Sequence, residues 1–347
     1  MKFLNINIPL NTIYCKDLSD FYQNIRMTGN IKLNVSSLGE LVENGITRVS
    51  VAIGVFDGVH RGHQLLLKQL AEMAGKNNSV PVAMTFYPHP RAVLNPQNPP
   101  PLLISPWKRI CLLHNYGAEA VVTLSFSQSF AEQSPEKFME KCLHSPEVTI
   151  CGLCVGEKWR FGAKGSGGID LLEKMSVEEG FDFAAVPELV MNGEVVSSTS
   201  VRRAVAGGKL SEAAEMLGRN YSLAGIVERG HQDATRDLQH PTANLNIQYG
   251  VLPPCGVYAA RAFINGRKYT AAVNVGVSPT YNRPDEKKVR LEVHCINFSE
   301  DIYGGKVEVE LLEYIREERC FLSPGELKKQ IETDLERIIQ IVGIQGV

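Results

Sequence analysis

Short apolar runs alternate with helical patterns through the amino-terminal part of the chain. The runs cover residues 48–55, 80–86, 118–124 and 148–155. Between them, apolar residues recur at helical spacing, as over 107–116 and 134–143. Strands separated by helices are typical of a parallel sheet with helices on both faces. The sequence therefore predicts a doubly wound α/β fold for this part.

The pattern changes near residue 220, where short strands with turn signals replace the helical segments. Strands are predicted over 223–227, 256–264, 268–275, 289–296 and 306–314. A last helix is predicted over 323–342, because Ser323, Pro324 and Glu326 have the spacing of a capping box. This pattern predicts a small antiparallel β-barrel with a carboxyl-terminal helix. The expected divisions are a leader without assigned chemistry (1–47), an α/β domain (48–219) and a barrel domain (220–347).

The first apolar run ends in a glycine-rich turn that leads into a helical pattern. The segment reads Val51-Ala-Ile-Gly-Val-Phe-Asp-Gly-Val-His-Arg-Gly-His63. At such a junction, the free N–H groups and the dipole of the helix attract phosphate. His60 and His63 lie one helical turn apart, so both imidazoles can donate to polyphosphate oxygens. A structural histidine pair is the plain alternative, and zinc would need two further ligands that no nearby Cys or His supplies.

A second candidate phosphate site lies at 197–203, where hydroxyl residues precede two arginines. Capping of a helix start would explain one such hydroxyl. Four consecutive hydroxyls exceed that need, and Arg202 would add a fixed bidentate charge. We expect Ser198, Thr199 and Arg202 to contact phosphate and Arg203 to face solvent.

Two loops that follow predicted strands are candidate ligand walls. The prolines of Tyr87-Pro-His-Pro-Arg91 force a rigid exit from the strand. His89 taken alone is equally an ordinary loop residue. Residues 156–168 combine glycines with cations and aromatics, which suits a loop over a ring and phosphates and also a solvated loop.

Phe56-Asp-Gly-Val-His-Arg-Gly-His63 resembles the H-x-G-H signature of nucleotidyltransferases. Its form is that of prokaryotic bifunctional riboflavin kinase/FMN adenylyltransferases, also called FAD synthetases. Other segments resemble this family in order: S-S-T-x-x-R at 197–202, P-T-A-N at 241–244, and the segments 256–258, 274–280, 291–294 and 301–321. The resemblance covers about residues 45–342. It implies phosphorylation of riboflavin to FMN, followed by adenylyl transfer from ATP to FMN with release of pyrophosphate.

The resemblance also implies roles for single residues. It assigns catalysis to His60, His63, Arg202 and Glu292, the last as the carboxylate that accepts the proton of the riboflavin 5′-hydroxyl. It assigns ATP binding to Gly54, Phe56, Asp57, Gly62, Ser198 and Thr199. It assigns flavin binding to Pro88, His89, Arg91 and Phe161. Thr242 and Asn244, two residues apart on a strand, would offer hard oxygen ligands to Mg²⁺.

Two segments depart from the family pattern. Lys158 stands where the family has Asp or Asn. In Thr235-Arg-Asp-Leu-Gln-His240, both glycines of the family's G-R-x-L-G-F segment are replaced, and the added Asp237 repels phosphate. Three alternatives therefore stay open: an FAD synthetase with an impaired kinase domain, a non-catalytic flavin or nucleotide sensor, and a nucleotidyltransferase for another phosphorylated acceptor. The intact histidine pair and Arg202 argue against the sensor.

Composition narrows the class of protein. The 347 residues are 44% apolar and 21% charged with a net charge of −2, which lacks the basic excess of a nucleic-acid-binding protein. The eight cysteines are scattered, and Cys151-Gly-Leu-Cys154 lies in a predicted buried strand, which favours structural thiols. No apolar stretch approaches a membrane span. We expect a cytoplasmic enzyme acting on ATP, riboflavin and FMN, without nucleic-acid or membrane partners; the sequence leaves its oligomeric state open.

Overall fold

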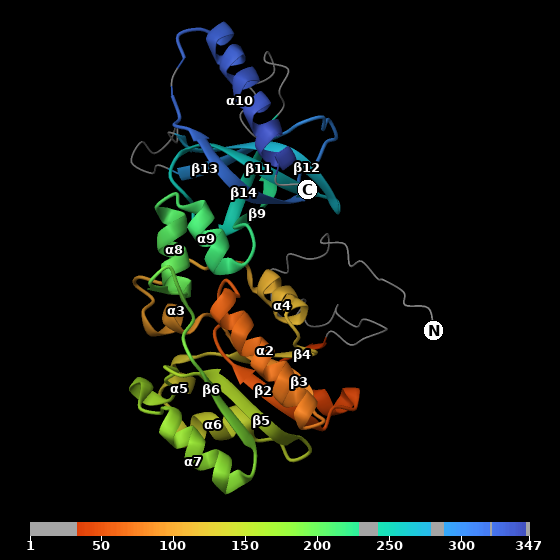
Figure 1. Cartoon of the computed structure of the whole chain (residues 1–347), viewed down its shortest axis with the longest axis vertical. Helices are drawn as coiled ribbons and strands as arrows, with labels where there is room; N and C mark the ends of the chain where they lie inside the picture. The colour runs from red at the N-terminus through yellow and green to blue at the C-terminus, as the bar shows by residue number, and fades with distance from the viewer. Residues whose placement is uncertain (1–32, 229–241, 279–287, 320, 345–347) are drawn as a thin grey trace, which may run out of the picture. The chain divides into compact units, whose positions relative to one another are not determined.

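The computed structural model describes residues 33–228, 242–278, 288–319 and 321–344 (Figure 1). Among these residues, 33–101 and 106–198 form one compact unit. Residues 102–105 and the described residues from 199 onward form the other. Helix α9 (Leu210–Leu217) packs against a strand of the barrel, so the units divide at residue 198, before the boundary expected near residue 220.

A parallel sheet organises the first unit. Its strands are β1 (Leu33–Val35), β2 (Arg48–Ile53), β3 (Val80–Tyr87), β4 (Ala120–Ser125), β5 (Thr149–Gly156) and β6 (Asp182–Val186). They lie in the order β1-β4-β3-β2-β5-β6, and every neighbouring pair is parallel. The order reverses between β2 and β5, and ligands of open α/β sheets bind at such a switch point. The doubly wound sheet is confirmed.

Helices cover both faces of this sheet. They are α2 (Arg61–Lys76), α3 (Pro90–Leu94), α4 (Pro106–Asn115), α5 (Gln128–Ala131), α6 (Pro135–Leu143) and α7 (Ile169–Glu179), with the 3-10 turns η1 (Gly39–Asn44) and η2 (Ala163–Gly165). Helix α2 packs on β2, β3 and β5. On the opposite face, Phe138 and Met139 of α6 share a core with Val49 and Val51 of β2. Figure 1 shows α2 and α4 apart from α5, α6 and α7. A small hairpin, β7 (Val190–Met191) and β8 (Glu194–Val195), follows β6.

Part of the expected leader belongs to the sheet. Strand β1 pairs with β4. Leu38 and Leu41, in and beside η1, are buried in the same core. Residues of the segment 33–47 therefore pack with the parallel sheet, although they precede the expected domain start at residue 48. Three strand residues are too few to show a period in the sequence. Residues 1–32 of the leader lie outside the described residues.

A closed antiparallel barrel organises the second unit. Its strands are β9 (Ser222–Glu228), β10 (Ala243–Tyr249), β11 (Gly256–Ile264), β12 (Arg267–Ser278), β13 (Lys288–Cys295) and β14 (Lys306–Arg316), in the order β10-β13-β12-β11-β14-β9. The five predicted strands are confirmed within three residues at each end, and the sixth, β10, carries the end of the P-T-A-N segment. Alternate positions fill the interior, among them Leu245, Tyr258, Val273, Val293 and Val309.

Helix α10 (Pro324–Ile344) covers part of the outer face of the barrel, where it packs against β11, β12 and β14. Its Ile338 is fully buried in a cluster with Val257 and Ala259. Half of the predicted capping box forms, because the Glu326 N–H donates to the Ser323 hydroxyl at 3.2 Å, while the Glu326 carboxylate accepts from the Leu322 N–H at 3.2 Å. Helix α8 (Ser198–Ala206) begins at the division between the units and precedes α9.

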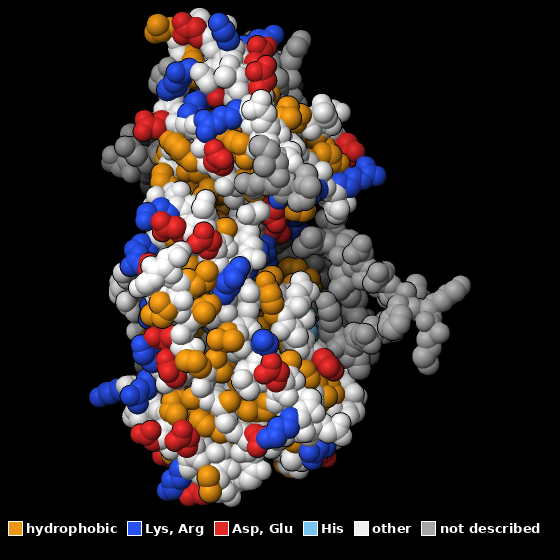
Figure 2. All heavy atoms as spheres, viewed as in Figure 1, with side chains coloured by type: hydrophobic (Ala, Val, Ile, Leu, Met, Phe, Trp, Pro, Cys, Tyr) orange, Lys and Arg blue, Asp and Glu red, His pale blue; other side chains and the backbone are white. Residues whose placement is uncertain are grey.

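The charged side chains on the surface and the buried cysteine thiols are those of an ordinary globular protein. On the face drawn in Figure 2, Lys and Arg side chains are interspersed with Asp and Glu. Cys151 and Cys154 both lie in β5, and burial raises the pKa of Cys154 to about 12, so its thiol stays protonated. Within the described ranges, no helix is both long and apolar enough to cross a membrane.

Candidate active sites

The turn after β2 holds its backbone in an uncommon conformation. Phe56 and Val59 have φ values of 55° and 41°, and both side chains are fully buried. Left-handed backbone is costly for a β-branched residue such as valine and concentrates at functional sites. A Cβ on Gly54 would lie 3.1 Å from the Phe56 ring, so Gly54 makes room for that ring. The surrounding structure therefore fixes the turn before any ligand binds.

The turn brings the two histidines together at the start of α2. His60 is the N-cap, and its Nδ1 accepts from the His63 N–H at 3.4 Å. The imidazoles stack with centroids 3.6 Å apart, and the Phe56 ring lies edge-on to His63 at 5.2 Å. Two stacked imidazolium cations would repel each other, so at most one ring carries a proton charge.

His63 is held in its neutral form. Burial lowers its pKa well below the ordinary value, and the nearby His60 and Arg109 lower that pKa further. Its Nδ1 is buried and has no hydrogen-bond partner among the described residues. A proton on Nε2 leaves only a lone pair unsatisfied at Nδ1, whereas the other tautomer would bury an unpaired N–H. Nε2 is therefore the donor that His63 offers to a ligand.

A buried arginine lies under this turn. Arg109 of α4 donates from its guanidinium to the carbonyl oxygens of Val55 and Phe86, each at 3.0 Å. These carbonyls lie at the carboxyl ends of β2 and β3. Arg109 therefore links the two strand ends and adds a fixed positive charge there. No motif in the sequence singled out this residue. Its signal was a cation among the apolar positions of the helix, next to Ile110.

The S-S-T-x-x-R segment is hydrogen-bonded to the turn. The Ser198 hydroxyl donates to the carbonyl oxygen of Asp57 at 2.8 Å, although 141 residues separate them. A Cβ on Gly62 would lie 3.2 Å from the His60 ring and 3.4 Å from the Val196 carbonyl oxygen. Glycine at this position therefore permits the close approach of the two segments.

Helix α8 carries the rest of that segment. Thr199 and Arg202 lie three residues apart, which places them on one side of the helix. Thr199 is exposed and Arg202 is half-buried. Arg203 is exposed, as predicted. Ser200, the last of the four consecutive hydroxyl residues, is buried.

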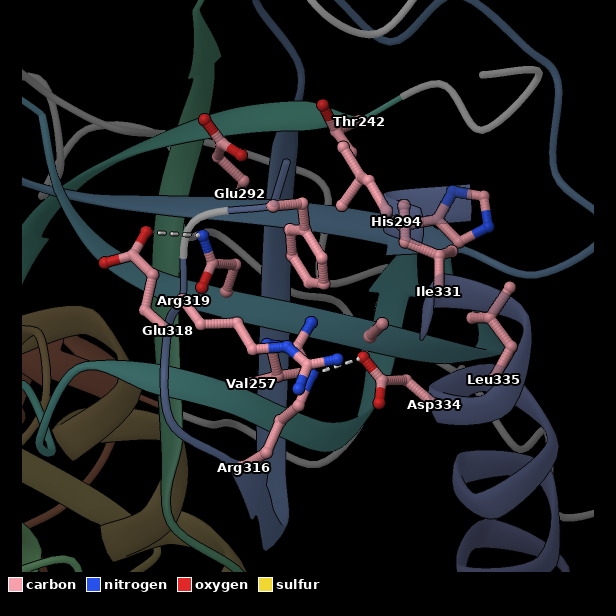
Figure 3. A pocket seen from close by; sticks show the side chains of 14 residues that line it. Thr242, Val257, Glu292, His294, Arg316, Glu318, Arg319, Ile331, Asp334 and Leu335 are labelled. Atoms are coloured by element: carbon pink, nitrogen blue, oxygen red, sulfur yellow. Dashed lines mark hydrogen bonds and ion pairs between the residues drawn. The ribbon is translucent and has the colours of Figure 1, made fainter. Parts of the chain in front are cut away.

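In the second unit, a cavity of about 340 Å³ lies between the outer face of the barrel and α10 (Figure 3). Figure 3 shows Thr242 and Glu292 on one side of it and Ile331, Asp334 and Leu335 of α10 on another. The remaining lining residues are Val257, Ala272, Asn274, His294, Arg316, Glu318, Arg319, Phe321 and Leu327. The predicted carboxylate and the predicted hydroxyl ligand thus share one cavity.

Glu292 is the centre of a polar row across three strands. Its direct cross-strand neighbours are Asn244 on β10 and Asn274 on β12. Buried Leu291 and Val293 flank Glu292, so its own side chain points to the outer face of the barrel. The structure brings Asn244 beside Glu292, but Asn244 is outside the cavity lining. The altered segment Thr235–His240 and Pro241 lie outside the described residues.

An ion pair joins α10 to the end of β14. Arg316 Nε donates to Asp334 Oδ2 at 2.8 Å, and both side chains are largely buried. Gln330 Nε2 donates to the other oxygen of Asp334 at 2.7 Å. The Arg319 guanidinium lies 4.7 Å from the centre of the Phe321 ring. These contacts fix the wall of the cavity that α10 provides.

Comparison with known proteins matches both parts of the chain. Residues 43–200 match the model of the FAD synthetase family, and residues 217–342 match that of riboflavin kinase. A protein of Buchnera aphidicola is 34% identical over 290 residues, which are 83% of this chain and 92% of that protein. A protein of Bacillus subtilis is 31% identical over 314 residues, 89% of this chain and 97% of that protein. Both are named bifunctional riboflavin kinase/FMN adenylyltransferase.

The chain belongs to the bifunctional riboflavin kinase/FMN adenylyltransferase family. A crystal structure described as a macrolide-efflux protein from Streptococcus pneumoniae has the same fold, with a TM-score of 0.73 and 30% identity. The match covers 83% of this chain and 93% of that one.

The segment expected to line the flavin side in this family has a clear local structure. His89 is buried and caps α3, where its Nδ1 accepts from the Arg91 N–H at 3.1 Å. Pro88 and Arg91 are exposed at the carboxyl end of β3. His89 thus positions the helix start, while Pro88 and Arg91 are accessible.

Phe161, which the resemblance to the family assigns to flavin binding, has little exposed surface. Its ring is only 3% exposed and belongs to the core of the sheet. It stacks on Trp159 with centroids 4.8 Å apart and tilts against Phe138 at 5.7 Å. A Cβ on Gly167 would lie 2.7 Å from it. Packing between loop and sheet holds this ring, and the half-buried Trp159 is the more accessible aromatic.

Lys158, the departure from the family pattern, points toward a neighbouring loop. It forms an ion pair with Glu188, which raises the pKa of the lysine. The Glu188 N–H also donates to Glu157 at 3.0 Å. The ammonium thus ties the loop after β5 to the loop after β6. Both partners are exposed, so the pair contributes little to stability.

Proposed function

We propose that this chain makes FAD from riboflavin in two ATP-dependent steps. Riboflavin is phosphorylated to FMN in the barrel domain. FMN then receives the adenylyl group of ATP in the domain of the parallel sheet. Membership of the family supports both steps. The observation that carries the proposal is the stacked pair His60 and His63, with His63 held neutral, beside the switch point of the sheet.

Adenylyl transfer needs alignment more than acid–base chemistry. A phosphate oxygen of FMN attacks the α-phosphorus of ATP, and the bond to pyrophosphate breaks. The free N–H groups at the start of α2 and Nε2–H of His63 donate to the phosphate oxygens, where charge grows in the transition state. We keep Ser198, Thr199 and Arg202 as further ATP ligands, on the strength of their motif. The fixed turn supplies the orientation in advance.

Phosphorylation needs a base for an alcohol. The 5′-hydroxyl of riboflavin attacks the γ-phosphorus of ATP, Glu292 accepts its proton, and ADP leaves. The hydroxyl of Thr242 and the amide oxygen of Asn244 are hard donors beside Glu292, which fits Mg²⁺. When bound, Mg²⁺ neutralises charge on the phosphates.

We also propose that the enzyme works in the cytoplasm. The described free cysteines include the buried Cys142 and Cys154, which suit a reducing compartment.

The test is product analysis. Purified protein is incubated with ATP, Mg²⁺ and either riboflavin or FMN, and the flavins are separated by chromatography. We expect FAD from both substrates and none without ATP. FAD from FMN alone would mean that the altered segment 235–240 has abolished phosphorylation. No FAD from either substrate would overturn the proposal and redirect the search to another phosphorylated acceptor.

A further inference from the structure

Asn274, which lines the barrel cavity, has a side-chain oxygen that receives no hydrogen bond from the described residues. Oδ1 of Asn274 is buried and has no hydrogen-bond partner among the described residues. Asn274 lines the cavity and lies directly opposite Glu292 in the β12–β13 register. Buried polar atoms are nearly always paired, so an unpaired acceptor on a residue that lines a cavity indicates a missing donor.

The hydrogen bonds of the chain decide which end of this amide is already paired. Nδ2 of Asn274 donates to Oε1 of Glu318 at 3.3 Å, drawn as the dashed line from Glu318 in Figure 3. An ionised carboxylate only accepts hydrogen bonds, so the NH₂ group must point to Glu318. The opposite orientation would set two acceptors against each other. Oδ1 is therefore the atom left for a ligand.

A glycine makes room for this arrangement. Gly276 is two residues along β12 from Asn274 and points to the same side. A Cβ there would lie 2.5 Å from Oε1 of Glu318 and 3.2 Å from Nδ2 of Asn274. Residues 274, 276 and 318 thus act together to hold one amide with its oxygen outward. The sequence predicted a family match over 274–280 but no role for Asn274.

Directly opposite side chains on neighbouring strands have Cβ atoms about 5 Å apart. A ligand group that donates to Oδ1 of Asn274 therefore lies next to the group that meets Glu292. If Glu292 takes the proton of the 5′-hydroxyl, as the proposed function states, the donor beside it is another hydroxyl of the same polyol chain. We propose that Asn274 accepts a hydrogen bond from a ribityl hydroxyl of riboflavin and so positions the 5′-hydroxyl against Glu292.

The test compares riboflavin with lumiflavin, which has the flavin ring without the polyol. Binding is followed by flavin fluorescence, and phosphorylation by chromatography. For Asn274→Ala we expect the Kd and KM for riboflavin to rise about tenfold, with the Kd for lumiflavin and the KM for ATP unchanged. The matched control is Asn246→Ala, since Asn246 on β10 also donates to a glutamate, Glu228, but lies outside the cavity lining.

A pair of variants tests the orientation of the amide. Asn274→Asp alone sets two carboxylates together and should weaken riboflavin binding. Adding Glu318→Gln restores a donor to the new carboxylate and should recover most of the affinity. No recovery would overturn the role of Glu318.

The outcomes separate this inference from the proposed function. Unchanged riboflavin affinity in Asn274→Ala overturns the inference. An equal loss of affinity for lumiflavin would mean that Asn274 contacts the flavin ring. A raised KM for ATP would mean that Asn274 contacts the nucleotide. Either result overturns the inference. Wild-type protein that binds riboflavin but does not phosphorylate it would refute the proposed kinase step alone, because the binding comparison would still test Asn274.

Discussion

The two candidate sites are built by different means. The site at β2 consists mainly of backbone: a turn with left-handed residues, the start of α2 and two histidines fixed by stacking. The barrel cavity consists of side chains in a row across three strands, closed by a helix through the Arg316–Asp334 pair. The first site should therefore be sensitive to changes of backbone and packing, and the second to the loss of single polar groups.

Glu292→Gln is expected to have the largest effect. Removing the base should slow riboflavin phosphorylation by roughly 10² to 10⁴-fold, while adenylyl transfer to FMN continues unchanged. Product chromatography with each substrate measures both. Glu310→Gln, on β14 outside the cavity lining, is the matched control and should retain both activities. Normal phosphorylation by Glu292→Gln would remove Glu292 from the mechanism.

His63→Ala should have the opposite selectivity. Loss of one preorganised donor should slow FAD formation from FMN on the order of 10²-fold, with riboflavin phosphorylation retained. Circular dichroism checks that the fold is intact. His144→Ala, at an exposed position after α6, is the control. If both histidine variants made FAD equally well, the backbone of the turn would carry the site alone.

Breaking the ion pair of α10 tests the closure of the barrel cavity. Asp334→Ala leaves Arg316 without its carboxylate and should lower the free energy of unfolding by about 2 kcal/mol, less than for a fully buried pair because Arg316 is partly exposed. Thermal unfolding measures the change. The double variant Arg316→Met with Asp334→Leu should regain stability but not riboflavin phosphorylation. Recovery of both would show that the pair only packs the helix.

Gly62→Ala should affect the turn. The added Cβ presses on the His60 ring and on the Val196 carbonyl, so we expect about tenfold slower FAD formation and a loss of about 1 kcal/mol in stability. Gly75→Ala, in the same helix with open space around it, should instead stabilise the protein by about 0.5–1 kcal/mol. Equal behaviour of the two variants would contradict the close approach at Gly62.

The smallest expected effect is on pH dependence. In the folded protein, His63 stays neutral at pH values well below its ordinary pKa. Only the unfolded chain therefore takes up a proton on this histidine as the pH falls below about 6.5. Stability should then be lost with falling pH, by about 1 kcal/mol at pH 6 for this one group. Chemical denaturation from pH 7.5 to 6 measures it. His63→Gln should remove this part of the slope; an unchanged slope would mean that His63 titrates normally.

Local patterns in the sequence determined much of this protein. The alternation of apolar runs and helical patterns predicted the parallel sheet, and the change of pattern near residue 220 predicted the barrel. Caps such as Ser323 and motifs such as H-x-G-H are also local, because their residues lie within one turn or strand. These features follow from the periods of helices and strands, which a sequence shows directly.

Contacts between distant segments were decided only by the tertiary structure. Packing buried the Phe161 ring in the core of the sheet, and it placed Arg109 under the turn that it supports. The register of β12 against β13 put Asn274 opposite Glu292, and the approach of Glu318 fixed its amide. Each of these depends on which segments meet in space and at what register. The periodicity of hydrophobic and polar residues within a segment does not determine these long-range contacts. Side chains of the same type follow the same pattern whether they contact a ligand, a neighbouring side chain or water.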